Sequence, residues 1–184
     1  MKIVVPIQLV PDLVEELIIA NDEKRLDPDE IRWIINEYDN HAIEHTILIK
    51  EKSGAEVIII APDLEGADDA LYTAAAKGAD KLVKISEDFV EEPFNTHALA
   101  KMFAEIIKEV KPDLVLTGVF ANNSLDGALG PILAQLLGMP YVGYISGVGV
   151  SGGKVAISKE FPGGLKSQME ANLPAVLGIQ ASET

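Results

Sequence analysis

The sequence has 184 residues, no cysteine, 48% hydrophobic residues and a formal net charge of −14. A chain of this length buries about two thirds of the surface that it exposes when unfolded, which is enough for one domain without disulfides. The acidic balance excludes a nucleic-acid-tracking surface and argues against anionic membranes, because both need an excess of Lys and Arg. The absence of cysteine excludes thiolate metal sites and cysteine nucleophiles, and it suits a reducing cytoplasm, where we expect the protein to reside.

The N-terminal segment predicts a strand. The run MKIVVPIQLVPD has one Lys and an apolar stretch too short for a signal sequence or a bilayer span. Lys2–Ile7 is β-branched and apolar on both faces, which is typical of a strand in a parallel sheet covered by helices on each side. Gln8–Pro28 is polar and interrupted by prolines, although Val14–Ala20 is apolar enough to form a short strand. We therefore expect an ordered excursion after the first strand.

An alternation of strands and helices follows. Buried strands are predicted at 56–61, 81–85 and 113–117. The first helix begins near Asn36 or Asp39 and ends at Ser53-Gly54. It directs Ala42, Ile43, Thr46, Ile47 and Ile49 toward the core. A second helix spans 66–77 with Gly78 as its C-cap, and Thr96 is the candidate N-cap of a third helix that ends at Lys111-Pro112.

The pattern changes after Gly138. Gly152-Gly153 and Gly163-Gly164 separate β-rich runs, which is a hairpin signal, and an apolar strand is predicted at 175–179. Four βα units with an antiparallel finish predict an α/β fold: a doubly wound, mostly parallel, Rossmann-like sheet with an antiparallel C-terminal extension. We expect residues 1–184 to form a single nucleotide-binding domain of this class. Right-handed crossovers place ligand at the ends of the central strands, near Ile7, Ala61 and Thr117.

The segment Leu114–Leu137 combines a predicted strand, a loop of small and amide residues, and an apolar helix. Such a loop presents free backbone N–H groups at a helix N-terminus, where anions and most often phosphate bind. No Lys follows the glycines, so the loop is not a phosphoryl-transfer P-loop, and it lacks the GxGxxG pattern. The loop therefore favours binding without turnover. The alternative, that its glycines only turn the chain, remains open.

Other reactive side chains carry weaker signals. His41 and His45 stand one helical turn apart with Glu44 between them, a spacing that a helix-borne metal site also uses. No third ligand is evident, so surface histidines are the preferred interpretation. Ser124 lacks the GxSxG elbow of a hydrolase. The acidic run Glu87–Glu92 is most simply a solvated loop.

Four blocks of the sequence resemble the β subunit of electron transfer flavoproteins. They are KIVVPIQLVPD at the start, NEYDNHAIEHTILIKE from Asn36, ALYTAAAKGADKLVKI from Ala70, and DLVLTGVFANNSLDGALGPILAQLLGMP from Asp113. The last block is long and gapless against the family signature D-L-V-L-x-G-x-x-A-x-D-x-D-x-x-Q-x-G-P-x-L-A-x-L-L-G-x-P. LPAVLGI near the end is similar to the family's L-P-A-V-x-x-V.

The resemblance implies a heterodimer in which an α subunit carries most of an FAD site and this chain covers the flavin. It implies a second nucleotide within this chain, AMP in most members and a second FAD in electron-bifurcating members. Electrons then pass from dehydrogenases to a quinone or another acceptor. Carried over by position, the cofactor contacts fall on Pro6, Ile7, Asn36, Asp39, Ile60, Gly118, Asn123, Ser124, Gly127, Ala128 and Leu129.

The sequence also departs from the family pattern. Ala128 and Leu129 replace the family's Gln and its neighbouring Thr or Val, and Asn123 and Leu125 replace two acidic residues. The sequence stops at Thr184, where family members continue with an arm that embraces the α subunit and docks dehydrogenases. We expect either a shortened form or a chain without its tail. The rival hypothesis is a stand-alone adenine-nucleotide-binding α/β module of the stress-protein type.

Overall fold

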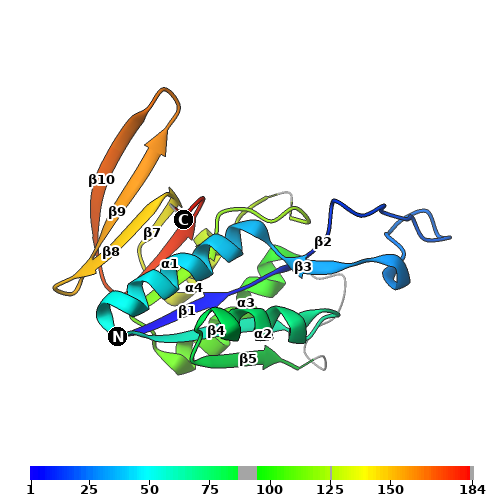
Figure 1. Cartoon of the computed structure of the whole chain (residues 1–184), viewed down its shortest axis with the longest axis horizontal. Coiled ribbons are helices and arrows are strands. Elements are labelled where there is room, and N and C mark those ends of the chain that lie inside the picture. Colours follow the sequence, from blue (N-terminus) through cyan, green and yellow to red (C-terminus); the bar gives the residue numbers. More distant parts are fainter. Residues whose placement is uncertain (87–94, 125, 183–184) are drawn as a thin grey trace.

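The computed structural model describes residues 1–86, 95–124 and 126–182. Its main sheet has six parallel strands in the order β5-β4-β1-β6-β11-β7 (Figure 1). Their bounds are β1 (Lys2–Pro6), β4 (Glu56–Pro62), β5 (Lys81–Ile85), β6 (Leu114–Gly118), β7 (Tyr141–Ile145) and β11 (Ala175–Ile179). The four strands predicted before residue 120 are confirmed, each within one residue at either end.

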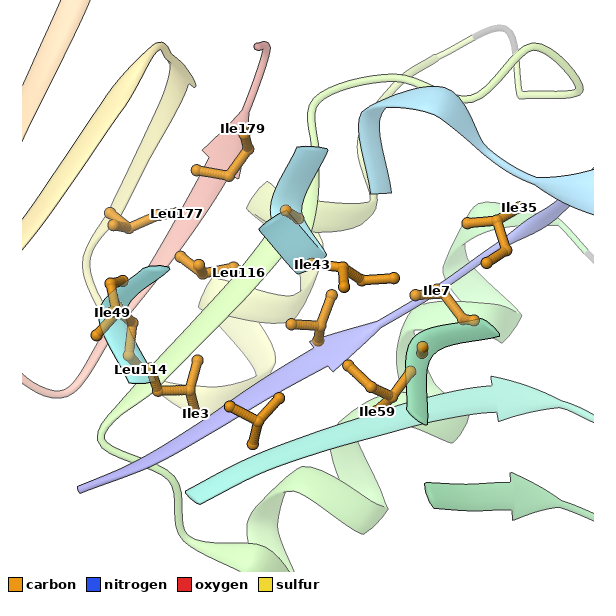
Figure 2. Close-up of a cluster of buried hydrophobic side chains, with 14 of the residues drawn as sticks. Ile3, Ile7, Ile35, Ile43, Ile49, Ile59, Leu114, Leu116, Leu177 and Ile179 are labelled. Carbon is orange, nitrogen blue, oxygen red and sulfur yellow. The ribbon is translucent and has the colours of Figure 1, made fainter. Parts of the chain in front are cut away.

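Helices cover both faces of this sheet. The first face packs against α1 (Glu37–Ser53) and α2 (Ala67–Lys77), the second against α3 (Thr96–Val110) and α4 (Leu129–Leu137). Ile3 and Val5 of β1, together with Ile7 just after it, belong to the cluster under α1, whereas Val4 of β1 belongs to the cluster under α3. All four are fully buried, so the apolar run of β1 reflects burial on both faces. Figure 2 shows the first cluster, where β1, β4, β6 and β11 meet α1.

The helix ends follow local sequence signals. Helix α1 begins after Asn36 and ends at Gly54, whose φ of 68° is the left-handed conformation that glycine adopts readily. Helix α3 differs from the prediction by one residue, because Asn95 and not Thr96 is its N-cap. The Asn95 side chain accepts a hydrogen bond from the Ala98 backbone N–H at 2.9 Å. No helix among the described residues is both long and apolar enough to cross a bilayer.

The excursion after β1 forms a small separate sheet. Strand β2 (Leu9–Pro11) pairs antiparallel with β3 (Trp33–Ile35), and the 3-10 helix η1 (Pro28–Glu30) lies between them in sequence. The strand predicted over Val14–Ala20 is wrong, since only a single bridge joins Ile19 to Leu26. The Val14 side chain is 92% exposed. A β-prone run without a surface to pack against gains little from strand formation.

The antiparallel extension is a three-stranded sheet of β8 (Gly147–Ser151), β9 (Lys154–Phe161) and β10 (Leu165–Asn172). Positive φ angles at Gly152-Gly153 and Gly163-Gly164 form its two turns, which confirms the hairpin signals. Strands β7 and β11 are not part of it, because both pair in parallel within the main sheet. The α/β class with an antiparallel extension is confirmed. The predicted loop at Glu87–Glu92 lies outside the described residues.

Candidate functional site

The order of the strands creates a switch point between β1 and β6. After β1 the chain adds β4 and β5 on one side, and it then returns to place β6 on the other side of β1. The connections that leave β1 and β6 therefore diverge at the C-terminal edge of the sheet, where doubly wound proteins bind ligands. We call residues 7–8 the β1 loop, and residues 119–128, described except at 125, the β6 loop.

A buried carboxylate joins these two loops. Asp39, in the first turn of α1, is fully buried. Its Oδ2 accepts a hydrogen bond from the Gln8 N–H at 2.9 Å, and its Oδ1 accepts one from the Gly118 N–H at 2.8 Å. A Cβ on Gly118 would lie 2.6 Å from that Oδ1, so the approach needs glycine. Burial raises the pKa of Asp39 to about 6, against the lowering effect of these N–H groups and of Asn36.

Asn36 and Asn123 supply further links. The Asn36 backbone N–H donates to the Gln8 carbonyl at 3.0 Å, and its Nδ2 donates to the Phe120 carbonyl at 2.7 Å. As the N-cap of α1, Asn36 makes no side-chain cap bond, because its amide is directed to the β6 loop instead. Asn123 Nδ2 donates to the Leu9 carbonyl at 3.2 Å. The two loops and the start of α1 thus form one hydrogen-bonded unit.

Beside this unit lies a cavity of about 310 Å³. Its lining comes from the β1 loop, the start of α3 and the β6 loop, and consists of Gln8, Asn95, Thr96, Leu99, Asn123, Ser124 and Asp126. Asp126 Oδ1 accepts hydrogen bonds from Thr96 Oγ1 at 3.0 Å, Ser124 Oγ at 2.9 Å and the Ala128 N–H at 3.2 Å. These donors, the Ala128 N–H first, lower the pKa of Asp126. The cavity wall therefore carries several polar side chains, and the Asp126 carboxylate, the only one among its described lining residues, is held in place by donors.

The predicted cofactor residues lie at this edge of the sheet, but they differ in whether they line the cavity. Asn123 and Ser124 line the cavity. Asn36, Asp39 and Gly118 are buried and do not line it. Pro6, Ile7 and Ile60 meet where β1 pairs with β4, and the Ile7 N–H donates to the Ile60 carbonyl at 2.8 Å. Gly127, Ala128 and Leu129 lead into α4, with Leu129 buried.

Sequence reasoning missed five of the lining residues: Gln8, Asn95, Thr96, Leu99 and Asp126. One signal could have found two of them. Asn95 and Thr96 are polar residues at a helix start, and every helix that follows a parallel strand begins at the C-terminal edge of the sheet. No sequence signal indicates which of these helix starts lies next to the β6 loop.

Two larger hollows lie away from the switch point. One of about 600 Å³ lies at the opposite edge of the sheet, where Lys50 pairs with Asp80. The other, of about 710 Å³, borders β3 and the start of α2 and includes Trp33 and Gly66. Neither is lined by the β1 loop or the β6 loop, so neither combines the two divergent connections that define a ligand crevice in this fold.

The helix histidines contact the end of the described chain. His45 is only 4% exposed, so its assignment to the helix surface is wrong. Its Nε2 lies 2.9 Å from the Ala181 carbonyl, which can only accept, so Nε2 carries the proton. His41 Nδ1 lies 2.9 Å from Ser182 Oγ. Within residues 1–86, 95–124 and 126–182, no three His, Asp or Glu side chains converge as metal ligands. The histidines therefore anchor residues 181–182 to α1.

Fold and cavity together define a doubly wound α/β protein with a cavity at the β1/β6 switch point, which is where proteins of this class bind ligands. Residues 25–183 match the electron transfer flavoprotein domain, and the chain belongs to this family. It is similar to proteins named electron transfer flavoprotein subunit beta. One, from Syntrophomonas wolfei, is 37% identical over 83% of this chain and 59% of its own length. Another, from Methylophilus methylotrophus, is 30% identical over 98% of this chain and 69% of its own length.

A third such protein, from Bacillus subtilis, is 30% identical over 92% of this chain and 65% of its own length. The matches confirm the resemblance found in the four sequence blocks. The chain spans between 59% and 69% of the length of these three curated relatives.

Proposed function

We propose that this chain acts as the β subunit of an electron transfer flavoprotein. In this role it relays electrons from dehydrogenases to a downstream acceptor, with FAD held at its interface with an α subunit. It is a carrier subunit and performs no reaction on a substrate of its own. The family match and the names of the relatives support the proposal. The stress-protein alternative is not favoured, because the matches fall in the electron transfer flavoprotein family.

We also propose that the cavity at the switch point holds an adenine nucleotide. The observation that carries this proposal is that both divergent loops and the start of α3 line one cavity. Its amide and hydroxyl groups both donate and accept hydrogen bonds, which suits the edge of a purine and the hydroxyls of a ribose. Its volume of about 310 Å³ is at the lower end of the range of roughly 300–1,000 Å³ for small-molecule sites, which favours AMP over a second FAD.

The residues present fit such a ligand in part. Asn36 Oδ1 is a buried acceptor with no hydrogen-bond partner among the described residues, and the Asn36 backbone N–H is bonded to the lining residue Gln8. The Ala128 N–H, which could meet a phosphate at the start of α4, already donates to Asp126. Asn95, Thr96, Asn123 and Ser124 would therefore hold the nucleoside part, and the remaining N–H groups of the β6 loop would meet the phosphate.

Co-expression with the α subunit tests both parts of the proposal. The purified complex should show flavin absorbance, and mass analysis of the denatured complex should identify FAD and AMP. A complex with no flavin absorbance that releases no adenine nucleotide would overturn the proposal. Release of FAD alone, in twice the amount of the complex, would place a second FAD in the cavity and indicate a bifurcating member.

A variant pair separates the cavity from the flavin. Asn123→Leu replaces a lining amide with an apolar side chain and should abolish release of AMP while flavin absorbance remains. Asn122→Leu is the matched control, because Asn122 is exposed in the same loop and does not line the cavity. Equal AMP contents in the two variants would show that the nucleotide does not bind in this cavity.

A further inference from the structure

We propose that Asp39 is a positioning residue, which holds the β1 loop and the β6 loop in the arrangement that accepts the nucleotide and does not touch the nucleotide itself. This inference rests on the proposed function, since it concerns the same cavity. It differs from the position-by-position transfer from the family, which counts Asp39 among the cofactor contacts.

The burial of Asp39 separates it from the ligand. Asp39 is fully buried and is absent from the cavity lining, and its two oxygens accept the Gln8 and Gly118 N–H groups. The residues that it holds do reach the cavity, because Gln8 lines it directly and Gly118 opens the loop that supplies Asn123. A change at Asp39 therefore makes no direct contact with a ligand in the cavity, and we infer that it acts by moving these loops.

Stability alone does not explain a carboxylate at this position. A buried charge is costly, and among the described residues no cation contributes to the pKa of Asp39. An ionised carboxylate nevertheless offers what no neutral side chain of this size offers, which is two acceptor oxygens and no donor. It can accept N–H groups from the ends of two neighbouring strands, β1 and β6, at the same time. This property matches the need at a switch point, where two loops must be held at one separation.

Protonation of Asp39 should have the same effect as replacing it with Asn. Either change turns one acceptor into a donor, so one of the two N–H groups loses its partner. The groups that face Asp39 from α1, the β1 loop and β6 are the Asn36 amide and the Gln8 and Gly118 N–H groups, none of which titrates. With a pKa of about 6, the carboxyl changes state within the range in which the protein can be assayed.

The test measures AMP binding by calorimetry across a pH series, using the full chain in complex with its α subunit after removal of bound nucleotide. Wild type, Asp39→Asn and Asp113→Asn are compared. Asp113 is the matched control, because it also ties β1 to β6, through the Lys2 N–H at 2.8 Å, but at the opposite edge of the sheet. Since the phosphate of AMP itself titrates near pH 6, Asp39→Asn serves as the reference for that effect.

At about pH 8 we expect Asp39→Asn to bind AMP about tenfold more weakly than wild type, as for loss of one charge-assisted hydrogen bond. The ratio of the two affinities should fall toward one as the pH drops below about 6, where wild-type Asp39 is itself protonated. Asp113→Asn should follow wild type throughout. If Asp39→Asn does not fold, the affinity of wild type should still fall more steeply below about pH 6 than the ionisation of AMP alone predicts.

The outcomes distinguish this inference from the proposed function. If wild type binds no AMP and releases none on denaturation, the nucleotide proposal fails. If wild type binds AMP, and Asp39→Asn binds it equally well with the same pH profile, the positioning role is overturned while the nucleotide site stands. An equal loss of affinity in Asp113→Asn also overturns it, because any tie between β1 and β6 would then suffice.

Discussion

The same two strands, β1 and β6, are tied by an aspartate at each end of the sheet, but the surroundings of the two aspartates differ. At the N-terminal edge, Asp113 is exposed, and nearby carboxylates pair with lysines, as Asp80 does with Lys50. At the C-terminal edge, Asp39 is buried, and among the described residues no cation contributes to its pKa. The exposed arrangement at the N-terminal edge costs little free energy and contributes little stability. The burial of Asp39 at the C-terminal edge costs stability and, in our proposal, sets the geometry of the two loops. The buried aspartate lies at the edge where we propose that the nucleotide binds.

The largest expected effect is at Gly118. Gly118→Ala would place a Cβ 2.6 Å from Asp39 Oδ1 and 2.7 Å from Tyr38 Cβ. We expect the free energy of unfolding to fall by about 3 to 4 kcal/mol, from overpacking together with the loss of a buried hydrogen bond. Urea denaturation measures this change. Gly149→Ala is the control, since no atom lies within 4 Å of its added Cβ. Equal stability of the two variants would contradict the close approach at Gly118.

The second largest effect is expected in the pH dependence of stability, and it arises from Asp39. The pKa of Asp39 is raised from 3.8 to about 6 in the folded state. Between these values the folded protein binds a proton that the unfolded chain does not, so this group adds stability as the pH falls. Relative to Asp39→Asn, wild type should gain about 2 to 3 kcal/mol in unfolding free energy between about pH 7 and pH 4. Chemical denaturation across this range tests it, and a flat difference would contradict a buried carboxylate with no cation beside it in the described part of the chain.

A smaller effect is expected at the start of α3. Asn95→Ala removes the acceptor for the Ala98 N–H and should lower the unfolding free energy by about 1 kcal/mol. Because Asn95 also lines the cavity, AMP affinity should fall as well. Asn122→Ala, at an exposed position of the β6 loop, should change neither quantity. Loss of stability without loss of AMP affinity would show that Asn95 only caps the helix.

The smallest effect is expected at the N-terminal edge. Lys50→Met removes an ion pair with Asp80 and a 2.8 Å hydrogen bond to the Gly78 carbonyl. Both partners of the ion pair are partly exposed, so the loss should be about 0.5 kcal/mol and should shrink as salt is added. Denaturation at low and high ionic strength measures it. A loss of several kcal/mol that does not depend on salt would remove the contrast between the two edges.

Much of the fold could be predicted because burial on both faces leaves a plain signature. The strands that became β1, β4 and β6 are continuous apolar runs, and their bounds were predicted closely. The same signature in Ala175–Ile179 predicted a strand but not its partners. It lies between β6 and β7 in the parallel sheet. The hydrophobic pattern of a strand indicates how deeply the strand is buried. Which strands it pairs with depends on contacts between residues that are distant in sequence.

The site was predictable only in outline. The signature loop could be recognised, and Asn123 and Ser124 do line the cavity. The role of Asp39 could not be predicted, because an aspartate in the first turn of a helix is usually explained by the helix dipole. Only the structure shows that its oxygens meet N–H groups 31 and 79 residues away in sequence. The wall formed by Thr96 depends in the same way on the packing of α3 beside the β6 loop.

The position of β11 in the sheet also has a consequence for the order of assembly. In the parallel sheet, β7 pairs with β11, and β11 in turn pairs with β6. During synthesis, β11 is made after every other strand of that sheet. About thirty more residues must therefore be synthesised after β7 before its pairing partner is available. The stretch made in between contains the whole of β8, β9 and β10. Completion of the parallel sheet therefore depends on β11, the strand of that sheet that is synthesised last.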